Sequence, residues 1–246
     1  MCVYTGACAS IPLDYPKTPS SALPPSNQTR LWNGLNSQAE QHAGQSAFFL
    51  IPSGMDAFLS RYFLIEAADR TLDLQYYMFH DKVFIADNTV AIVGGRNLGN
   101  EYFDASSNVN FSDLDILMTG LITRQVSTAF DEYWNSEAAV PIEALVSSKP
   151  GIDDLKEGQR ILQVNRESLK DSEYAKGVKE SDLLSRLIAG NVPVVWAEGV
   201  FLSDRPIKVK TSSEQDPSAY MAPRLQTYAR GVKSEDIRIS TSATIC

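Results

Sequence analysis

The stretch from residue 80 to residue 97, HDKVFIADNTVAIVGGRN, constrains the fold more than any other part of the chain. Two short runs of apolar and β-branched residues are separated by Asp87-Asn88, a pair typical of hairpin turns. Side chains two residues apart in a strand point to the same face of a sheet, so His80 and Lys82 are expected to lie side by side. The stretch therefore predicts a β-hairpin that presents an imidazole next to an ammonium group.

The same stretch contains the complete pattern H-x-K-x4-D-x6-G-G-x-N. A neutral imidazole can attack phosphorus or transfer a proton near pH 7, and an ammonium group beside it can neutralise a phosphate. Gly94 and Gly95 would let the backbone approach an anion, and Asn97 adds a polar side chain. A purely structural interpretation also exists, because Asp-Asn and Gly-Gly are ordinary turn sequences. The presence of all the parts in order favours a phosphate-handling site.

This pattern resembles the signature of the phospholipase D superfamily. The flanking segments resemble its bacterial cardiolipin synthase branch, closest to the C-type members. They are TLDLQYYM (71–78), IVGGRNLGNEYF (92–103), FSDLDILMTG (111–120) and FDEYWNS (130–136). The resemblance covers nearly the whole chain but only the first half of the family pattern, since the family carries a second H-x-K-x4-D and this sequence has one.

The resemblance implies a phosphodiester exchange that needs no metal and no cofactor. It makes His80 the nucleophile or the general acid–base, and it makes Lys82 and Asn97 ligands of the phosphate oxygens. Asp87 would support the motif, and the two glycines would shape the phosphate-binding loop. The implied substrates are phosphatidylglycerol and phosphatidylethanolamine at a membrane surface, with cardiolipin as the product.

An acidic residue in the strand after the hairpin is also implied, and Asp113 is the candidate for a carboxylate behind His80. Asp113 and Asp115 have a second interpretation, as solvated charges on the outer face of an edge strand. The sequence leaves both interpretations open.

Charge and composition limit the other classes of function. The 246 residues carry a net charge of −8, which argues against a nucleic-acid partner because such proteins usually present a basic face. The two histidines and three cysteines show no metal-ligand spacing, so a metal enzyme is not expected. No apolar run reaches the length of a membrane-spanning helix.

Residues 1–45 are expected to form a disordered tether rich in Pro and Ser. The segment around Cys8, GACAS, looks like the mature start of a bacterial lipoprotein, which would place the protein at the membrane of the cell envelope. The position before Gly6 is Thr5, where such signals prefer Leu. The alternative is a functionless N-terminus with an incidental cysteine.

Alternating and helical apolar patterns predict an α/β fold, a phospholipase D-like mixed sheet flanked by helices that forms an incomplete single half. The expected domain occupies residues 46–145, followed over 146–246 by a helical linker and the first strand of a truncated second half. The predicted strands lie near 71–79, 82–87, 89–93, 113–119 and 192–197, and the predicted covering helices near 55–69 and 122–135.

Two features suggest that the sequence lacks parts of the family pattern. Strand-like sequence continues from Thr71 to Ala86 without a Gly, Pro or Asn, although the family places further strand–helix units there. We interpret the junction at 79–81 as an internal deletion, with a naturally compact variant as the alternative. After a predicted strand over 236–240, the ending STSATIC replaces the expected aromatic continuation.

Three functions follow from these observations. The first is phosphatidyltransferase activity in cardiolipin synthesis, reduced because the second motif is missing. The second is a non-catalytic remnant or phosphate-binding module. The third is a one-motif phosphodiesterase or nuclease that forms a homodimer to pair its histidines, which the acidic charge argues against.

Overall fold

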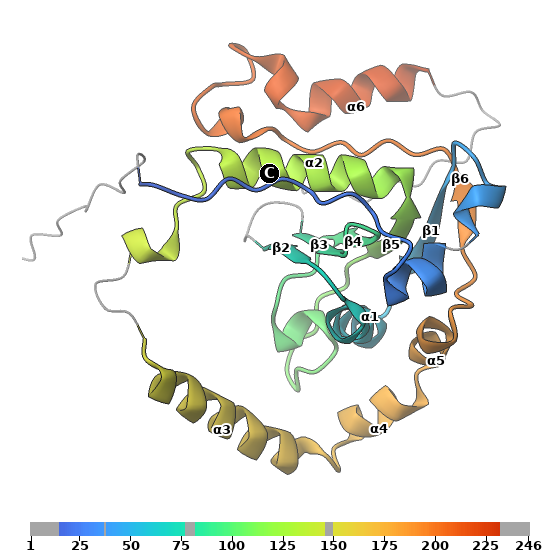
Figure 1. Ribbon diagram of the computed structural model, residues 1–246, viewed down its shortest axis with the longest axis vertical. Coiled ribbons are helices and arrows are strands. Elements are labelled where there is room, and N and C mark those ends of the chain that lie inside the picture. The colour runs from blue at the N-terminus through green and yellow to red at the C-terminus, as the bar shows by residue number, and fades with distance from the viewer. Residues whose placement is uncertain (1–14, 37, 77–81, 146–149, 232–246) are drawn as a thin grey trace, which may run out of the picture.

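A computed structural model describes residues 15–36, 38–76, 82–145 and 150–231 (Figure 1). Six strands within these ranges form one sheet in the order β2-β3-β4-β5-β1-β6. The strands are β1 (Ser46–Ile51), β2 (Leu72–Gln75), β3 (Lys82–Ala86), β4 (Val90–Gly94), β5 (Asp115–Gly120) and β6 (Val195–Ala197). The α-helices are α1 (Gly54–Ala67), α2 (Leu121–Asn135), α3 (Ile152–Leu169), α4 (Glu173–Glu180), α5 (Asp182–Ala189) and α6 (Met221–Arg230).

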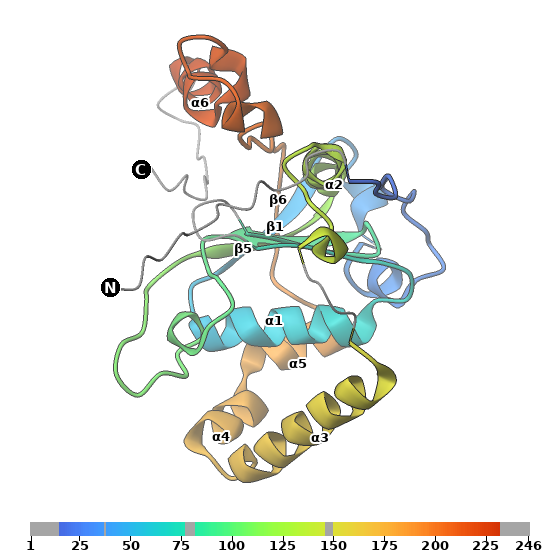
Figure 2. The ribbon, with the colours of Figure 1, turned by 90° about the vertical axis from the view of Figure 1, so that its left-hand side faces the viewer.

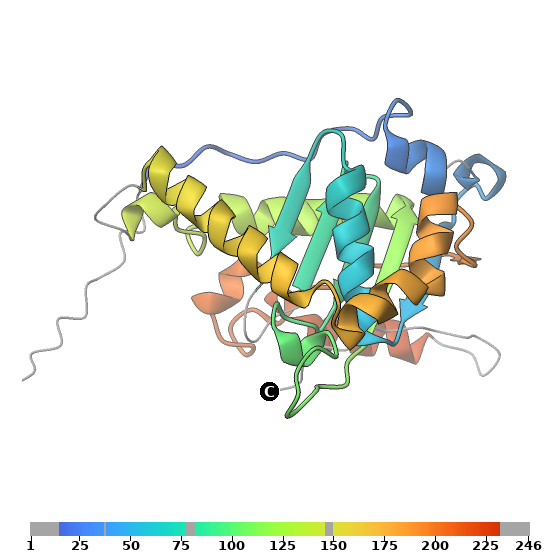
Figure 3. The same cartoon turned by 90° about the horizontal axis from the view of Figure 1, so that it is seen from below.

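Helices α1 and α2 cover opposite faces of the sheet, as Figure 2 shows edge-on. Helix α5 lies beside α1, with α3 and α4 further out on the same side, and α6 lies beyond α2. Seen from below, α1 lies over the sheet and runs roughly along the direction of its strands (Figure 3). The α/β class predicted from the sequence is therefore confirmed.

Strands β3 and β4 are buried on both faces, which explains why their sequences are almost continuously apolar. Phe84 and Ile92 pack in the core under α1, whereas Val83 and Val93 pack in the core under α2. Leu187 of α5 belongs to the first of these cores. Part of the segment 146–246 thus packs against the predicted domain, although the domain division itself stays a prediction.

The sheet is antiparallel at every described strand pair, so the predicted mixed sheet is wrong in this respect. Helix α1 connects β1 to β2, and these two strands run in the same direction. Strands β5, β4 and β3 lie between them in the sheet, however, and each runs opposite to its neighbours. Strands with a common direction are therefore never adjacent.

The hairpin turn has the predicted geometry. Asp87 and Asn88 have φ angles of +51° and +53°, and the Thr89 N–H donates to the Ala86 carbonyl at 3.0 Å. Positive φ at both central residues is what a type I′ turn requires, and Asp and Asn tolerate it better than most residues. The turn sets the register of the hairpin, in which Lys82 lies opposite Gly94.

The strand-like run from 71 to 86 forms two antiparallel strands, β2 and β3, with Gln75 opposite Val83. Strand β2 ends at Gln75 rather than near 79 as predicted. The junction at 79–81 lies outside the described residues, as does the predicted strand over 236–240.

Strand β1 was not predicted, although it pairs with both β5 and β6. Its sequence SAFFLI is a short apolar run without alternation, which a helix could equally contain. Strand β6 is shorter than predicted, and Val195 is exposed because β6 lies at the edge of the sheet. The Ser53 side chain accepts the Asp56 N–H at 3.2 Å and thereby caps α1.

Part of the predicted tether contacts the folded chain. Leu31 is buried in the core under α1. The segment before it runs along α2 (Figure 1), where Ser20 and Ala22 both donate to the Asp131 carboxylate. We call residues 17–24 the N-terminal strap.

Candidate functional site: a buried row of charged residues

Lys82 is the first residue of β3, and only 5% of its surface is exposed. It has the same parity as Phe84 and Ala86, so its side chain is on the face of the sheet that α1 covers. Lys82 has no hydrogen bond or ion pair with any residue in the described part of the chain. A largely desolvated ammonium group without an anionic partner is energetically costly, which makes this position a candidate for binding an anion.

A row of three residues crosses the sheet at this position. Lys82 of β3 lies opposite Gly94 of β4, and Gly94 lies opposite Asp115 of β5. Asp115 is fully buried, and a Cβ atom on Gly94 would lie 1.8 Å from its Oδ1 atom. Gly94 therefore leaves the space that the Asp115 carboxylate occupies.

Two arginines contact the Oδ2 atom of Asp115. Arg61 Nη1 of α1 lies 2.9 Å from it, and Arg96 Nη1 lies 3.4 Å from it. Both guanidinium groups are buried and also donate to backbone carbonyls, Arg61 to Ala57 and Arg96 to Ile51. The helix, the loop after β4 and the start of β5 are thus held together around one carboxylate.

The Arg61 side chain extends this network to Tyr76, the residue directly after β2, because its Nε donates to the Tyr76 hydroxyl at 2.9 Å. Burial alone would lower the pKa of Arg61, but the Asp115 carboxylate and Tyr76 outweigh it and raise the pKa. Burial also raises the pKa of Tyr76. Arg61 therefore stays charged, and Tyr76 stays a neutral acceptor beside it.

The second glycine of the loop contacts the second candidate carboxylate. A Cβ atom on Gly95 would lie 2.2 Å from Asp113 Oδ2, so Asp113 lies over Gly95 as Asp115 lies over Gly94. Asp113 Oδ1 accepts the N–H of Leu114 at 2.7 Å, and Asn97 Oδ1 accepts the N–H of Leu98 at 2.9 Å. Among the described residues, neither Asp113 nor Asn97 bonds to Lys82.

Asp87 lies at the other end of β3 from Lys82. Its carboxylate accepts the backbone N–H groups of Asp69, Arg70 and Thr71, at 2.6 to 3.1 Å. These bonds hold the connection between α1 and β2. The position gives Asp87 a structural role that is compatible with the predicted support of the motif.

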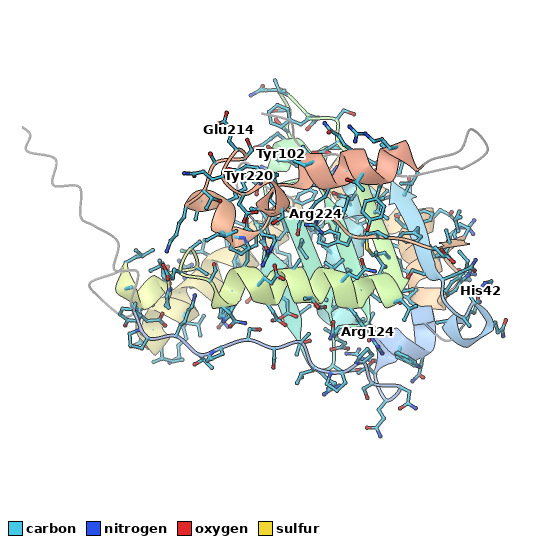
Figure 4. All side chains as sticks on the ribbon, turned by 90° about the horizontal axis from the view of Figure 1, so that it is seen from above. His42, Tyr102, Arg124, Glu214, Tyr220 and Arg224 are labelled. Atoms are coloured by element: carbon cyan, nitrogen blue, oxygen red, sulfur yellow. The ribbon has the colours of Figure 1, made fainter. Side chains whose placement is uncertain are left out.

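His80, the predicted nucleophile, lies outside the described residues, so its position relative to Lys82 stays a prediction. The other histidine, His42, stacks on Trp196 with ring centroids 4.2 Å apart. His42 lies beside β6, at the opposite edge of the sheet from β2 (Figure 4). It is therefore not part of the Lys82 row.

The sequence analysis did not identify Arg61 or Arg96 as site residues, and it left Asp115 open. The solvated-edge interpretation is wrong for Asp115, because β5 is an inner strand and Asp115 is fully buried. The available signal was the parity of Asp115 with Leu117, which packs in the core under α1. Arg61 had no local signal, since 54 residues separate it from Asp115.

A small cavity of about 30 Å³ lies on the opposite face, between α2, β2, β3 and the segment 201–204.

No metal site and no membrane-spanning helix is found among the described residues. In the described part of the chain, no cluster of His, Cys, Asp or Glu could hold a metal ion. Within the same residues, no helix combines the length and hydrophobicity needed to cross a bilayer.

The structure thus defines an α/β protein with a buried row of residues, Lys82, Gly94 and Asp115, beside a G-G-x-N loop. Comparison with known sequences adds information on the family. The chain is 23% identical to cardiolipin synthase C of Escherichia coli K12 over 261 aligned positions, which cover 73% of this chain and 54% of that protein. This similarity supports a relationship to the phospholipase D-like cardiolipin synthases.

Uncharacterised proteins from two Helicobacter pylori strains are also similar. They are 33% identical (strain J99) and 32% identical (strain 26695) over 133 residues, which are 54% of this chain and 26% of each of those proteins. The chain thus matches about half of the E. coli protein and about a quarter of each H. pylori protein. No protein-family model and no solved structure matches the chain.

The alignment with the E. coli protein is longer than the part of this chain that it covers. Since 73% of 246 residues is about 180, about 80 of the 261 aligned positions have no residue of this chain. Over the aligned region, the relative is therefore longer than this sequence.

Proposed function

We propose that this chain carries the phosphate-handling site of a phosphatidyltransferase of the cardiolipin synthase type, which acts on phospholipids at a bacterial membrane surface. The observation that carries the proposal is the buried Lys82, which has no partner among the described residues and lies in register with Gly94 of the G-G-x-N loop. The similarity to cardiolipin synthase C supports the lipid substrate. Phosphatidylglycerol and phosphatidylethanolamine are the proposed phosphatidyl donors and acceptors.

In this proposal, His80 attacks the phosphorus atom of the donor lipid, the P–O bond to the headgroup breaks, and the headgroup alcohol leaves after it takes up a proton. The hydroxyl group of the acceptor lipid then attacks the phosphohistidine and releases His80. Lys82 and Asn97 hold the phosphate oxygens, and the small Gly94 and Gly95 allow close approach of the backbone. Asp113 is the proposed carboxylate behind His80. Asp87 contributes by fixing the turn and the connection that hold β3, as its three backbone contacts indicate.

We expect the 246-residue chain by itself to have little activity. One imidazole that has become phosphorylated cannot also protonate the leaving alkoxide, and general acid catalysis contributes about 10²- to 10⁴-fold. The sequence carries one H-x-K-x4-D motif, so the histidine of a second motif would have to come from outside these 246 residues. A homodimer related by a two-fold axis could supply a second His80.

A phosphate-binding module without catalysis is the second candidate. It is favoured by the single motif and by the roughly 80 aligned positions that this chain lacks. Such a module would use Lys82 and the glycine loop but not the nucleophilicity of His80.

Attachment to the membrane through a lipid on Cys8 remains a further prediction that the proposed substrate makes reasonable.

The test is to incubate the purified chain with phosphatidylglycerol in mixed micelles and to measure cardiolipin by mass spectrometry. His80→Ala is compared with His42→Ala, because these are the two histidines in the sequence and His42 lies away from the Lys82 row. Lys82→Met is compared with Lys156→Met, since Lys156 is an exposed lysine of α3.

Low turnover that His80→Ala and Lys82→Met abolish, and that both controls retain, would support the enzyme. Phosphate binding that Lys82→Met removes, with no cardiolipin formed, would support the binding module. Neither turnover nor phosphate binding would refute both proposals. Light scattering on the same samples distinguishes a monomer from a homodimer.

A further inference from the structure

We infer that Asp115 is a positioning residue for Lys82. Its Oδ1 atom has no hydrogen-bond partner among the described residues, and a change of the Lys82 rotamer would bring the ammonium group to it. The two side chains belong to the same row across the sheet, on the same face, with one strand between them. This inference rests on the proposed function only in its consequence, which is that Lys82 is held ready for a phosphate.

Gly94 makes the approach possible. The absent side chain leaves a gap between β3 and β5, and Asp115 Oδ1 occupies that gap, 1.8 Å from where a Cβ atom would lie. Oδ1 therefore points from β5 toward β3. Directly opposed side chains on neighbouring strands have Cβ atoms about 5 Å apart, so the long Lys82 side chain can reach across Gly94.

The two oxygens of Asp115 have different surroundings. Oδ2 receives Arg61 and Arg96, whereas Oδ1 is buried and has no hydrogen-bond partner within the described part of the chain. An ionised carboxylate accepts several hydrogen bonds, and a buried oxygen that accepts none is destabilising. The arginines thus fix the carboxylate, and Oδ1 is available to accept a hydrogen bond from Lys82 of β3.

The charges of the buried residues on this face of the sheet also support the inference. Arg61, Arg96 and Lys82 are three buried cations, and Asp115 is the buried carboxylate among them. Tyr76 also faces the layer through Arg61 but contributes no charge. Contact with Asp115 Oδ1 would stabilise the Lys82 ammonium in its charged form, and the positive charge that remains would attract an anion.

The test observes the Lys82 ammonium directly by NMR of protein labelled with ¹⁵N-lysine, without any substrate. Lys82→Met assigns the signal. A bonded, buried ammonium exchanges its protons slowly, so we expect a resolved Lys82 signal near neutral pH. In protein that also carries ¹³C-labelled aspartate, we expect the deuterium isotope shift at the Asp115 carboxyl carbon to be larger than in Lys82→Met. The part of the shift that Arg61 and Arg96 cause is present in both proteins, so the difference reports the Lys82 hydrogen bond.

Gly94→Ala and Gly95→Ala are the matched variants. The first forces the Asp115 carboxylate away, and the second forces the Asp113 carboxylate away. We expect Gly94→Ala to speed exchange of the Lys82 ammonium protons by about tenfold or more, and Gly95→Ala to change it by less than about twofold. Circular dichroism verifies that each variant is folded.

An isotope shift at Asp115 that is the same with and without Lys82, or a Lys82 signal that responds equally to both glycine variants, would overturn the inference. If Gly94→Ala does not fold, the difference in isotope shift between the unaltered chain and Lys82→Met decides. A separate titration with inorganic phosphate tests the proposed function. A Lys82–Asp115 bond in a protein that binds no phosphate would leave this inference standing while the proposed function fails.

Discussion

Asp87 accepts the backbone N–H of Arg70 at 2.6 Å, although the two residues lie in different connections of the chain. The last residue of H-x-K-x4-D is thereby turned away from Lys82 and toward the segment between α1 and β2. One carboxylate joins the hairpin turn to the end of α1, and the motif includes a structural brace as well as candidate chemistry.

Replacing Asp87 should therefore reduce the stability of the fold and leave the arrangement of Lys82, Gly94 and Asp115 largely unchanged. We expect Asp87→Ala to lower the free energy of unfolding by about 2–4 kcal/mol, because three backbone donors lose their acceptor and Ala tolerates positive φ poorly. Urea denaturation measures the change. Asp87→Asn keeps one oxygen and should cost clearly less; equal losses for both variants would contradict this account.

The buried Arg61–Asp115 pair should matter far more than an exposed pair of the same residue types. We expect Arg61→Ala to cost about 3–5 kcal/mol, since it leaves a buried carboxylate with a weaker partner. Arg30→Ala, which breaks a partly exposed pair with Asp69, should cost less than about 1 kcal/mol. Similar values for the two variants in denaturation would show that burial does not determine the cost.

Asp73 should make stability depend on pH. Burial and the negative charge of Asp131 raise its pKa, so the folded chain retains a proton that the unfolded chain has already released. Stability then falls as the pH rises from the ordinary Asp value of about 3.9 through the raised pKa. Asp73→Asn should stabilise the protein near pH 7, by less than about 1 kcal/mol, and should have no such advantage near pH 3.

Thermal unfolding of both proteins between these pH values measures this difference. A benefit of Asp73→Asn that is the same at all pH values would mean that the charge of Asp73 is not its source.

Asp131 should hold the N-terminal strap, residues 17–24, against α2. It accepts from Ser20 and Ala22, and Lys17 donates to the carbonyls of Ser136 and Ala139 at the end of α2. We expect Asp131→Ala to speed trypsin cleavage after Lys17 several-fold while changing the free energy of unfolding by less than about 1 kcal/mol. Mass spectrometry of timed digests measures cleavage. Asp153→Ala, an exposed change on α3, is the control and should cleave like the unaltered chain.

The hairpin and α2 could be predicted because their signals are local. Asp87-Asn88 specifies its turn through its own backbone preferences, and Ile122, Val126 and Phe130 repeat at helical spacing on one buried face. The antiparallel order of the sheet could not be predicted, because it depends on which strands lie between β1 and β2.

The candidate site was predictable only in part. The pattern around Lys82 and Gly94 is compact in sequence, and their opposition follows from the turn. Asp115 becomes part of the site through the register between β4 and β5, and Arg61 becomes part of it through the packing of α1 on the sheet. Neither relationship produces a pattern that could be recognised within a short window of sequence.

Strand β2 lies at the margin of the sheet, and its ladder with β3 involves four residues. The connection from β2 to β3 is therefore a place where the length of the chain can change while the ladders among β3, β4, β5, β1 and β6 keep their register. We therefore expect an insertion or deletion in this connection to cost less stability than an equal change between two inner strands.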